Sequence, residues 1–214
     1  MYEVELKVRA AHEPVREALA AREATRLGTV RQADTYYDAP HRSFADTDEA
    51  LRLRHETREG ATDGHGGLTD GREAITVERE GDTAGNDGEV SRLTYKGPLV
   101  EAASKTREEA ETAVADPDAT DAILDALGFV PAARVTKHRE RFALGAYTIA
   151  LDAVEDLGTF VEVERTVDTD DGIGAARDGA RELLYDLGLD PDEQIRTSYL
   201  ELLLDAPDTD GPAE

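Results

Sequence analysis

The first residues of the chain alternate strictly between charged and apolar side chains. In the stretch YEVELKVR, residues 2–9, the charged positions are Glu3, Glu5, Lys7 and Arg9. Alternation of this kind predicts a half-buried strand, so the four charged side chains share one face. Carboxylates on such a face can bind a divalent metal ion, and an ammonium or a guanidinium can bind phosphate. The face is therefore a candidate for chemistry.

Four other predicted strands also carry charged rows, and the rows are largely segregated by sign. Solvation is the simplest explanation for one charged face, but a solvated face usually mixes both signs. Acidic pairs on two strands and basic pairs on two others indicate instead that the rows share the interior of a closed barrel. Beyond the first strand, the rows consist of Glu162 and Glu164, of Lys137, Arg139 and Arg141, of Arg52 and Arg54, and of Lys96.

Lysine is rare among the 24 basic residues of the chain. Only Lys7, Lys96, Lys105 and Lys137 are lysines, and the other 20 are arginines. Three of the four fall on the charged rows, and Lys105 lies near another strand. A background that disfavours lysine makes each remaining one a candidate for a specific role, although drift in composition would also explain the numbers.

A charged barrel interior is costly unless its charges are compensated. Facing acidic and basic rows compensate one another in part, and a bound polyanion with metal ions would complete the balance. Mg²⁺ commonly takes one or two carboxylates together with substrate phosphates. Arginine binds phosphate oxygens through its fork and lysine binds them as a point charge. The rows therefore favour chemistry on a metal-bound triphosphate.

Length and composition exclude several classes of protein. The 214 residues suffice for one substantial core, and cysteine is absent, which excludes disulfides and thiolate metal sites. No apolar stretch is long enough to span a membrane, and the charged N-terminus is unlike a signal peptide, so we expect a cytoplasmic protein. The net charge of −24 would repel nucleic acid and fits a halophilic archaeal cytoplasm.

The hydrophobic pattern predicts an α+β protein with one domain over residues 1–204. If helices cover the apolar outside, its core would be a closed antiparallel barrel with the charged rows inside. A glycine- and aspartate-rich insertion is expected at about residues 57–90, with a short strand at 73–80, and a disordered acidic tail at 205–214. The other predicted strands cover residues 2–9, 29–37, 50–56, 90–97, 104–114, 134–144, 146–158 and 159–167, and the helices cover 14–27, 117–127 and 173–187.

The motifs resemble a known family in their order along the chain. EVELK matches the Glu-x-Glu-x-Lys signature of the CYTH superfamily, the triphosphate tunnel metalloenzymes. It is followed by DTYYDAP, ALRLR, LTYKGP, KTREEAE, LGF, VTKHRERF, LDAVEDLGTFVEVE and SYLELL, so the resemblance spans roughly residues 1–204. DTYYDAP, YKGP and SYLELL look most like the class IV adenylate cyclase branch. The insertion departs from the family, in which this segment is a compact hairpin.

The resemblance implies a closed antiparallel barrel of about eight strands with a polar tunnel and helices packed outside. It also implies roles for particular residues and a divalent cofactor, Mg²⁺ or Mn²⁺. Tyr36 would be a proton acceptor, although a buried tyrosine of the barrel wall is the simpler interpretation, and Lys7 would act in catalysis as well as in binding. The implied metal ligands are Glu3, Glu5, Asp152, Glu162 and Glu164. The implied triphosphate ligands are Lys7, Arg52, Arg54, Lys96, Arg107, Lys137 and Arg139.

Three functions remain open at this point, since one fold and site support different chemistries. The first is cyclisation of ATP to cyclic AMP and pyrophosphate. The second is hydrolysis of inorganic triphosphate, a nucleoside triphosphate or thiamine triphosphate. The third is binding of polyphosphate or a nucleotide without turnover. In each case we expect a small-molecule triphosphate as the partner, no nucleic acid and no membrane, with a homodimer as an open alternative.

Overall fold

The computed structural model describes residues 1–59, 88–101 and 103–205. The predicted strand at 73–80, most of the predicted insertion and residues 206–214 of the predicted tail lie outside the described residues. Among the described helices, none is long and apolar enough to cross a membrane.

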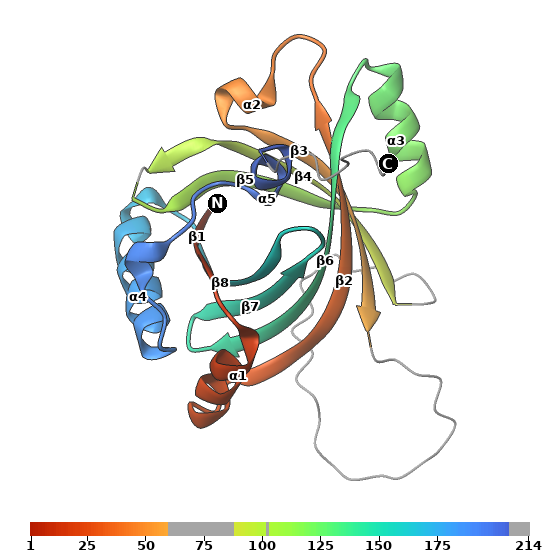
Figure 1. Cartoon of the computed structure of the whole chain (residues 1–214). Helices are drawn as coiled ribbons and strands as arrows, with labels where there is room; N and C mark the ends of the chain where they lie inside the picture. The colour runs from red at the N-terminus through yellow and green to blue at the C-terminus, as the bar shows by residue number, and fades with distance from the viewer. Residues whose placement is uncertain (60–87, 102, 206–214) are drawn as a thin grey trace, which may run out of the picture.

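The described strands close into an antiparallel barrel, which confirms the predicted fold (Figure 1). Each strand pairs with two neighbours, so the barrel has no free edge. Around the barrel the order is β1-β5-β4-β3-β2-β6-β7-β8, and β8 returns to β1. The strands are β1 (Tyr2–Arg9), β2 (Thr25–Asp38), β3 (Ala50–Glu59), β4 (Glu89–Glu101), β5 (Lys105–Val114), β6 (Val130–Leu144), β7 (Tyr147–Val154) and β8 (Gly158–Val167).

The described helices connect the strands or follow the last of them. The predicted helices at 117–127 and 173–187 agree with α3 and α4 to within one residue, but the helix predicted at 14–27 was too long. It ends at Ala21, because Glu23 takes a left-handed backbone (φ 55°) that reverses the chain into β2. The helices are α1 (His12–Ala21), α2 (Phe44–Thr47), α3 (Pro117–Ala126), α4 (Ile173–Asp186) and α5 (Tyr199–Leu204), with 3-10 turns at Asp170–Gly172 and Pro191–Glu193.

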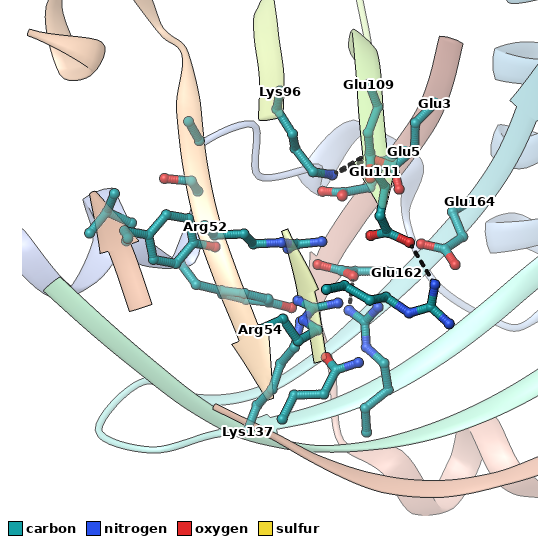
Figure 2. A pocket seen from close by; sticks show the side chains of 18 of the residues that line it. Glu3, Glu5, Arg52, Arg54, Lys96, Glu109, Glu111, Lys137, Glu162 and Glu164 are labelled. Atoms are coloured by element: carbon teal, nitrogen blue, oxygen red, sulfur yellow. Dashed lines mark hydrogen bonds and ion pairs between the residues drawn. The ribbon is translucent and has the colours of Figure 1, made fainter. Parts of the chain in front are cut away.

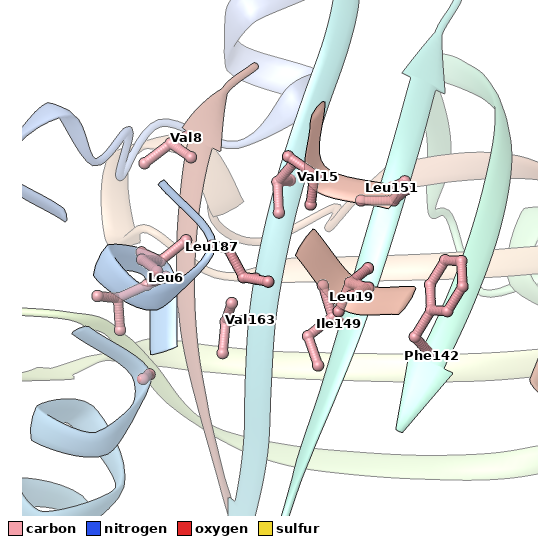
Figure 3. Close-up of a cluster of buried hydrophobic side chains, with 12 residues drawn as sticks. Leu6, Val8, Val15, Leu19, Phe142, Ile149, Leu151, Val163 and Leu187 are labelled. Atoms are coloured by element: carbon pink, nitrogen blue, oxygen red, sulfur yellow. The ribbon is translucent and has the colours of Figure 1, made fainter. Parts of the chain in front are cut away.

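Apolar side chains lie on the outer face of the barrel, so the charged rows turn inward. Leu6 and Val8 of β1 point outward and pack in one buried cluster with Val15 and Leu19 of α1 (Figure 3). Val163 of β8 joins this cluster. Successive side chains of a strand point to opposite faces. Because the apolar face of β1 is covered from outside, its glutamates and its lysine point into the barrel.

The C-terminal segment closes over one end of the barrel. The amide of Ile195 donates to the carbonyl of Lys7 at 2.7 Å, which fastens the segment beside β1. Ser198 then starts α5 with a capping box that it forms with Glu201. Tyr199, the first residue of this helix, is buried, and its hydroxyl donates to Asp152 at 3.1 Å.

Candidate active site

A cavity of about 850 Å³ runs through the barrel and is lined by charged side chains from every strand except β7, to which only Thr148 contributes. The predicted site residues, with the exception of Asp152, lie around this single cavity, and their individual roles stay predictions. The predicted residues that line it are Glu3, Glu5, Lys7, Tyr36, Arg52, Arg54, Lys96, Arg107, Lys137, Arg139, Glu162 and Glu164.

One wall of the cavity is acidic. Its carboxylates come from β5, β1 and β8, which are neighbours in the barrel, and Figure 2 shows them gathered on one side. The strand register brings Glu5 opposite Glu164 and Lys7 opposite Glu162. We call this surface the acidic wall; it consists of Glu3, Glu5, Glu109, Glu111, Glu162 and Glu164.

The opposite wall is basic and is formed by Arg52, Arg54, Lys137, Arg139 and Arg141 on β3 and β6, with β2 between these strands. We call it the basic wall. Figure 2 shows Arg52, Arg54 and Lys137 on this side, facing the glutamates. The separation of charge that the sequence predicted is therefore present in the folded chain.

Asp34 on β2 holds two arginines of the basic wall. Its carboxylate accepts two hydrogen bonds from Arg54, both of 2.6 Å, and lies 3.7 Å from Arg52. Although burial opposes ionisation, Arg54 and Arg52 hold the pKa of Asp34 well below its usual value. The carboxylate is therefore charged, and it fixes the direction in which the guanidinium groups point.

Asp152 on β7 has the same role for the other basic strand. Both of its oxygens accept hydrogen bonds of 2.6 Å from Arg139, and Lys137 donates to it at 3.2 Å. It is fully buried and does not line the cavity. The metal role that the resemblance implied for it stays a prediction, and in this arrangement its lone pairs are used to position cations.

The two glutamates of β8 differ in their electrostatic environment. Although burial opposes ionisation of Glu162, Arg139 and Lys137 hold its pKa well below the usual range. Burial raises the pKa of Glu164 to about 7, against the effect of Arg139 and with the help of Glu3. Near neutral pH Glu162 is therefore ionised, whereas Glu164 is partly protonated.

Some buried polar atoms of the cavity have no hydrogen-bond partner in the described part of the chain. Glu5 Oε1 is an unpartnered acceptor on the acidic wall, and the Nε atoms of Arg52 and Arg141 are unpartnered donors on the basic wall. Buried polar groups are normally satisfied. A cation at the first wall and an anion at the second would satisfy both kinds of atom.

The donor set fits a hard divalent cation such as Mg²⁺, which prefers carboxylate oxygens. As the side chains stand, however, no three acidic or histidine residues of the described ranges converge in a metal-binding cluster. Part of the reason is that cations engage the carboxylates directly: Lys96 bonds Glu3, and Arg139 bonds Glu162. Entry of a metal ion and a polyanion would exchange these ion pairs for metal–carboxylate and cation–phosphate contacts.

Two other predicted residues are held within the barrel wall. Arg107 donates to Asp48 Oδ1 at 2.5 Å and to the carbonyl of Gly97 at 2.9 Å, so it ties β5 to the turn before β3. The Tyr36 side chain is buried, and burial together with the Asp34 carboxylate raises the pKa of its phenol. A phenol of this kind is neutral at physiological pH.

The sequence interpretation missed the acidic residues of β5. Glu109 and Glu111 line the cavity beside Lys96, from which Glu109 lies 3.0 Å. The signal was present, because Lys105, Arg107, Glu109 and Glu111 alternate with a period of two, which is the spacing of one strand face. The high charge density of this stretch obscured that pattern.

Comparison with known proteins identifies the family to which this arrangement belongs. The family model of the CYTH domain matches residues 1–199. The chain therefore belongs to the CYTH domain family.

Individual relatives agree with this assignment. The chain is 32% identical over 171 residues, 80% of each chain, to the Methanocaldococcus jannaschii protein named "Putative adenylate cyclase MJ0240". The solved structure of protein PH1819 from Pyrococcus horikoshii is 36% identical, with a TM-score of 0.75, and the match covers 94% of this chain and 98% of that one. The Hippeastrum protein HpAC1 is 16% identical with a TM-score of 0.52 over 88% of each chain and shares the fold. It is described as a "putative adenylyl cyclase" with a dominant triphosphatase activity.

Proposed function

We propose that the barrel binds a nucleoside triphosphate together with Mg²⁺ or Mn²⁺ and converts ATP into cyclic AMP and pyrophosphate. The observation that carries the proposal is the pair of opposed walls. Within the described ranges, one wall has an unpartnered carboxylate oxygen and the other has unpartnered guanidinium nitrogens. A triphosphate with a divalent cation presents both complementary charges at once. The name of the M. jannaschii relative supports cyclisation as the reaction.

The residues of the two walls would have different roles, metal binding on the acidic wall and phosphate binding on the basic wall. Glu3, Glu5, Glu162 and Glu164 would hold the metal ion, which would supply charge neutralisation and activation of a hydroxyl group. Arg52, Arg54 and Arg139, fixed by Asp34 and Asp152, would bind the phosphate oxygens. Such positioning and electrostatic stabilisation supply most of the catalysis in phosphoryl chemistry.

In the proposed reaction the ribose 3′-oxygen attacks the α-phosphorus, and the bond from that phosphorus to the bridging oxygen breaks. Pyrophosphate leaves with that oxygen, and the hydroxyl proton passes to solvent. Tyr36 is not needed as a base, because its raised pKa keeps the phenol protonated.

Hydrolysis is the second candidate, with water attacking the terminal phosphorus in place of the ribose. It is supported by the triphosphatase activity reported for the Hippeastrum protein and by the many charged residues that line the cavity. Binding without turnover is supported less well, because carboxylates add nothing to the binding of a bare polyanion.

The test is a product analysis in high salt. Purified protein is incubated with ATP and either Mg²⁺ or Mn²⁺, and the products are separated by chromatography. Cyclic AMP with pyrophosphate supports cyclisation, whereas ADP or free phosphate contradicts it and supports hydrolysis. The Glu3→Gln/Glu5→Gln double variant should abolish either activity, and Glu13→Gln on the outer helix α1 is the matched control, which should behave as the parent.

A further inference from the structure

All four lysines of the chain line the cavity, but they differ in their partners. Lys7 donates to the carbonyl of Thr197 at 2.7 Å, and Lys137 donates to Asp152. Lys96 bonds Glu3. Lys105 makes no hydrogen bond or ion pair with any residue of the described ranges, although it is only partly exposed.

Burial and neighbouring cations disfavour the charged form of Lys105 and lower the pKa of its amine. In the β1–β5 register it lies directly opposite Glu5. Glu201 of α5 is a second carboxylate that acts on it, and the cations that act on it are Lys7, Lys96 and Arg107. Two carboxylates and three cations thus act on Lys105 in this corner, and one of the carboxylates, Glu5, is itself a candidate metal ligand. An ammonium in such a place is stabilised by an added anion.

Lys105 also occupies a particular side of the cavity. It belongs to β5, one of the three strands of the acidic wall, whereas the arginines proposed to bind phosphate come from the opposite wall. A phosphate bound near Glu3 and Glu5 would be repelled by the carboxylates on that side unless a cation lay among them. Lys96 is already bonded to Glu3, and Lys105 has its donors open within the described structure.

We propose that Lys105 is a further substrate-binding residue, whose ammonium contacts a non-bridging phosphate oxygen on the acidic side of the cavity. This inference rests on the proposed function and deepens it, since it assigns the polyphosphate chain a contact on both walls. The ligand class is a phosphate oxyanion, and the contact adds charge-assisted hydrogen bonds that no carboxylate of this wall provides.

Calorimetric titration with inorganic triphosphate in the presence of Mg²⁺ tests the proposal. Lys105→Gln should bind at least about tenfold more weakly than the parent, because hydrogen bonds to charged groups contribute strongly. Lys105→Arg should recover part of the affinity. The control is Arg16→Gln, which removes an equal charge from the outer salt bridge to Glu140 and should leave the affinity unchanged.

Thermal unfolding separates this role from a structural one. Because burial disfavours its charge and it has no bonded partner in the described part of the chain, Lys105→Gln should not lower the unfolding temperature. Equal affinity of parent and Lys105→Gln for triphosphate would overturn the inference and leave the proposed function intact. A parent protein that binds no triphosphate would overturn both.

Lysine acetylation provides a second test that needs no variant. Mass spectrometry after brief treatment with acetic anhydride should locate a modified Lys105 in the free protein. Saturating triphosphate with Mg²⁺ should reduce that modification at least about fivefold, because a bound phosphate covers the amine and favours its protonated, unreactive form. Equal acetylation with and without triphosphate, in a protein shown by calorimetry to bind it, would contradict the contact.

Discussion

At the scale of single residues, the basic wall depends on two buried aspartates that do not line the cavity. Asp34 and Asp152 each bond an arginine through both carboxylate oxygens. Paired in this way, a guanidinium keeps one orientation and loses little further entropy when it binds phosphate. The two aspartates therefore support binding by preorganising the groups that make contact.

Replacing Asp34 should destabilise the fold. Asp34→Asn leaves Arg54 without its buried charge partner, and we expect the free energy of unfolding at pH 7 to fall by about 3 kcal/mol. Asp125→Asn, an exposed change on α3, is the matched control. Chemical denaturation of both variants and the parent measures the difference, and equal effects of the two substitutions would contradict this role.

The same carboxylate predicts a direction of pH dependence. The pKa of Asp34 is lower in the folded protein than in the unfolded chain, so its stabilisation is fully present above the unfolded value of about 4. It is lost as the pH falls from there toward the folded value. The parent should therefore lose stability more steeply than Asp34→Asn below pH 4, and parallel curves would rule the idea out.

Tyr36 gives a residue-scale test of mechanism. If its neutral phenol only fills the barrel wall, Tyr36→Phe should keep kcat within about threefold of the parent. A general base would contribute about 10²–10⁴-fold instead. Steady-state kinetics on whichever triphosphate is turned over decides between the two, and a loss of a hundredfold would restore the tyrosine as a proton acceptor.

At the scale of elements, the sequence predicted those strands in which an apolar outer face alternates with a charged inner face. Period-two alternation therefore located β1, β3, β6 and β8 and the side chains that line the cavity. The boundary between α1 and β2 did not follow, because a left-handed Glu23 has no signature in composition. The position of α5 could not be predicted either, because it depends on contacts with strands that are distant in the sequence.

Tyr199 connects α5 to the barrel interior and should be its main anchor. Its ring lies edge-on to Phe160, with centroids 4.9 Å apart, and 4.2 Å beneath the Lys7 ammonium. Tyr199→Ala should lower the free energy of unfolding by about 3–5 kcal/mol and Tyr199→Phe by about 1. Tyr185→Ala removes an exposed ring and is the control. If Tyr199→Ala destabilises the protein no more than this control does, Tyr199 is not the main anchor of α5.

The packing of α4 depends on a glycine. A Cβ at Gly179 would overlap the hydroxyl of Tyr147, which donates to the carbonyl of Ala176 at 3.0 Å. Gly179→Ala should therefore destabilise by about 1–3 kcal/mol despite the better helix propensity of alanine. Gly174 has open space around it, so Gly174→Ala should be neutral or slightly stabilising. A melting temperature raised by both substitutions would contradict this packing.

At the scale of the whole molecule, the net charge of −24 should make stability depend on salt. Acidic self-repulsion acts over a Debye length of about 10 Å at 0.1 M salt and about 3 Å at 1 M. Raising KCl from 0.1 to 2 M should therefore raise the unfolding temperature by about 10 °C or more. Sucrose stabilises without screening and serves as the control, and equal responses to KCl and sucrose would remove the electrostatic explanation.

The sequence predicted the overall charge arrangement better than it predicted single contacts. Charged rows that are segregated by sign on separate strands indicated a shared interior, and this inference did not depend on how the strands pair. Strand register decides which carboxylates face the cavity and which bond arginines. It places Asp34 beside Arg54 and Glu5 opposite Lys105. Neither pair is close in sequence, so alternation alone does not reveal them.

The central claim is that the acidic and basic walls together bind a metal-bound triphosphate. Calorimetric titration of inorganic triphosphate, once with Mg²⁺ and once with EDTA, tests it most directly. The account predicts saturable binding with Mg²⁺ that weakens at least about tenfold in EDTA and in the Glu3→Gln/Glu5→Gln variant. Affinity that is unchanged by EDTA and by loss of these carboxylates, or no binding at all, would contradict it.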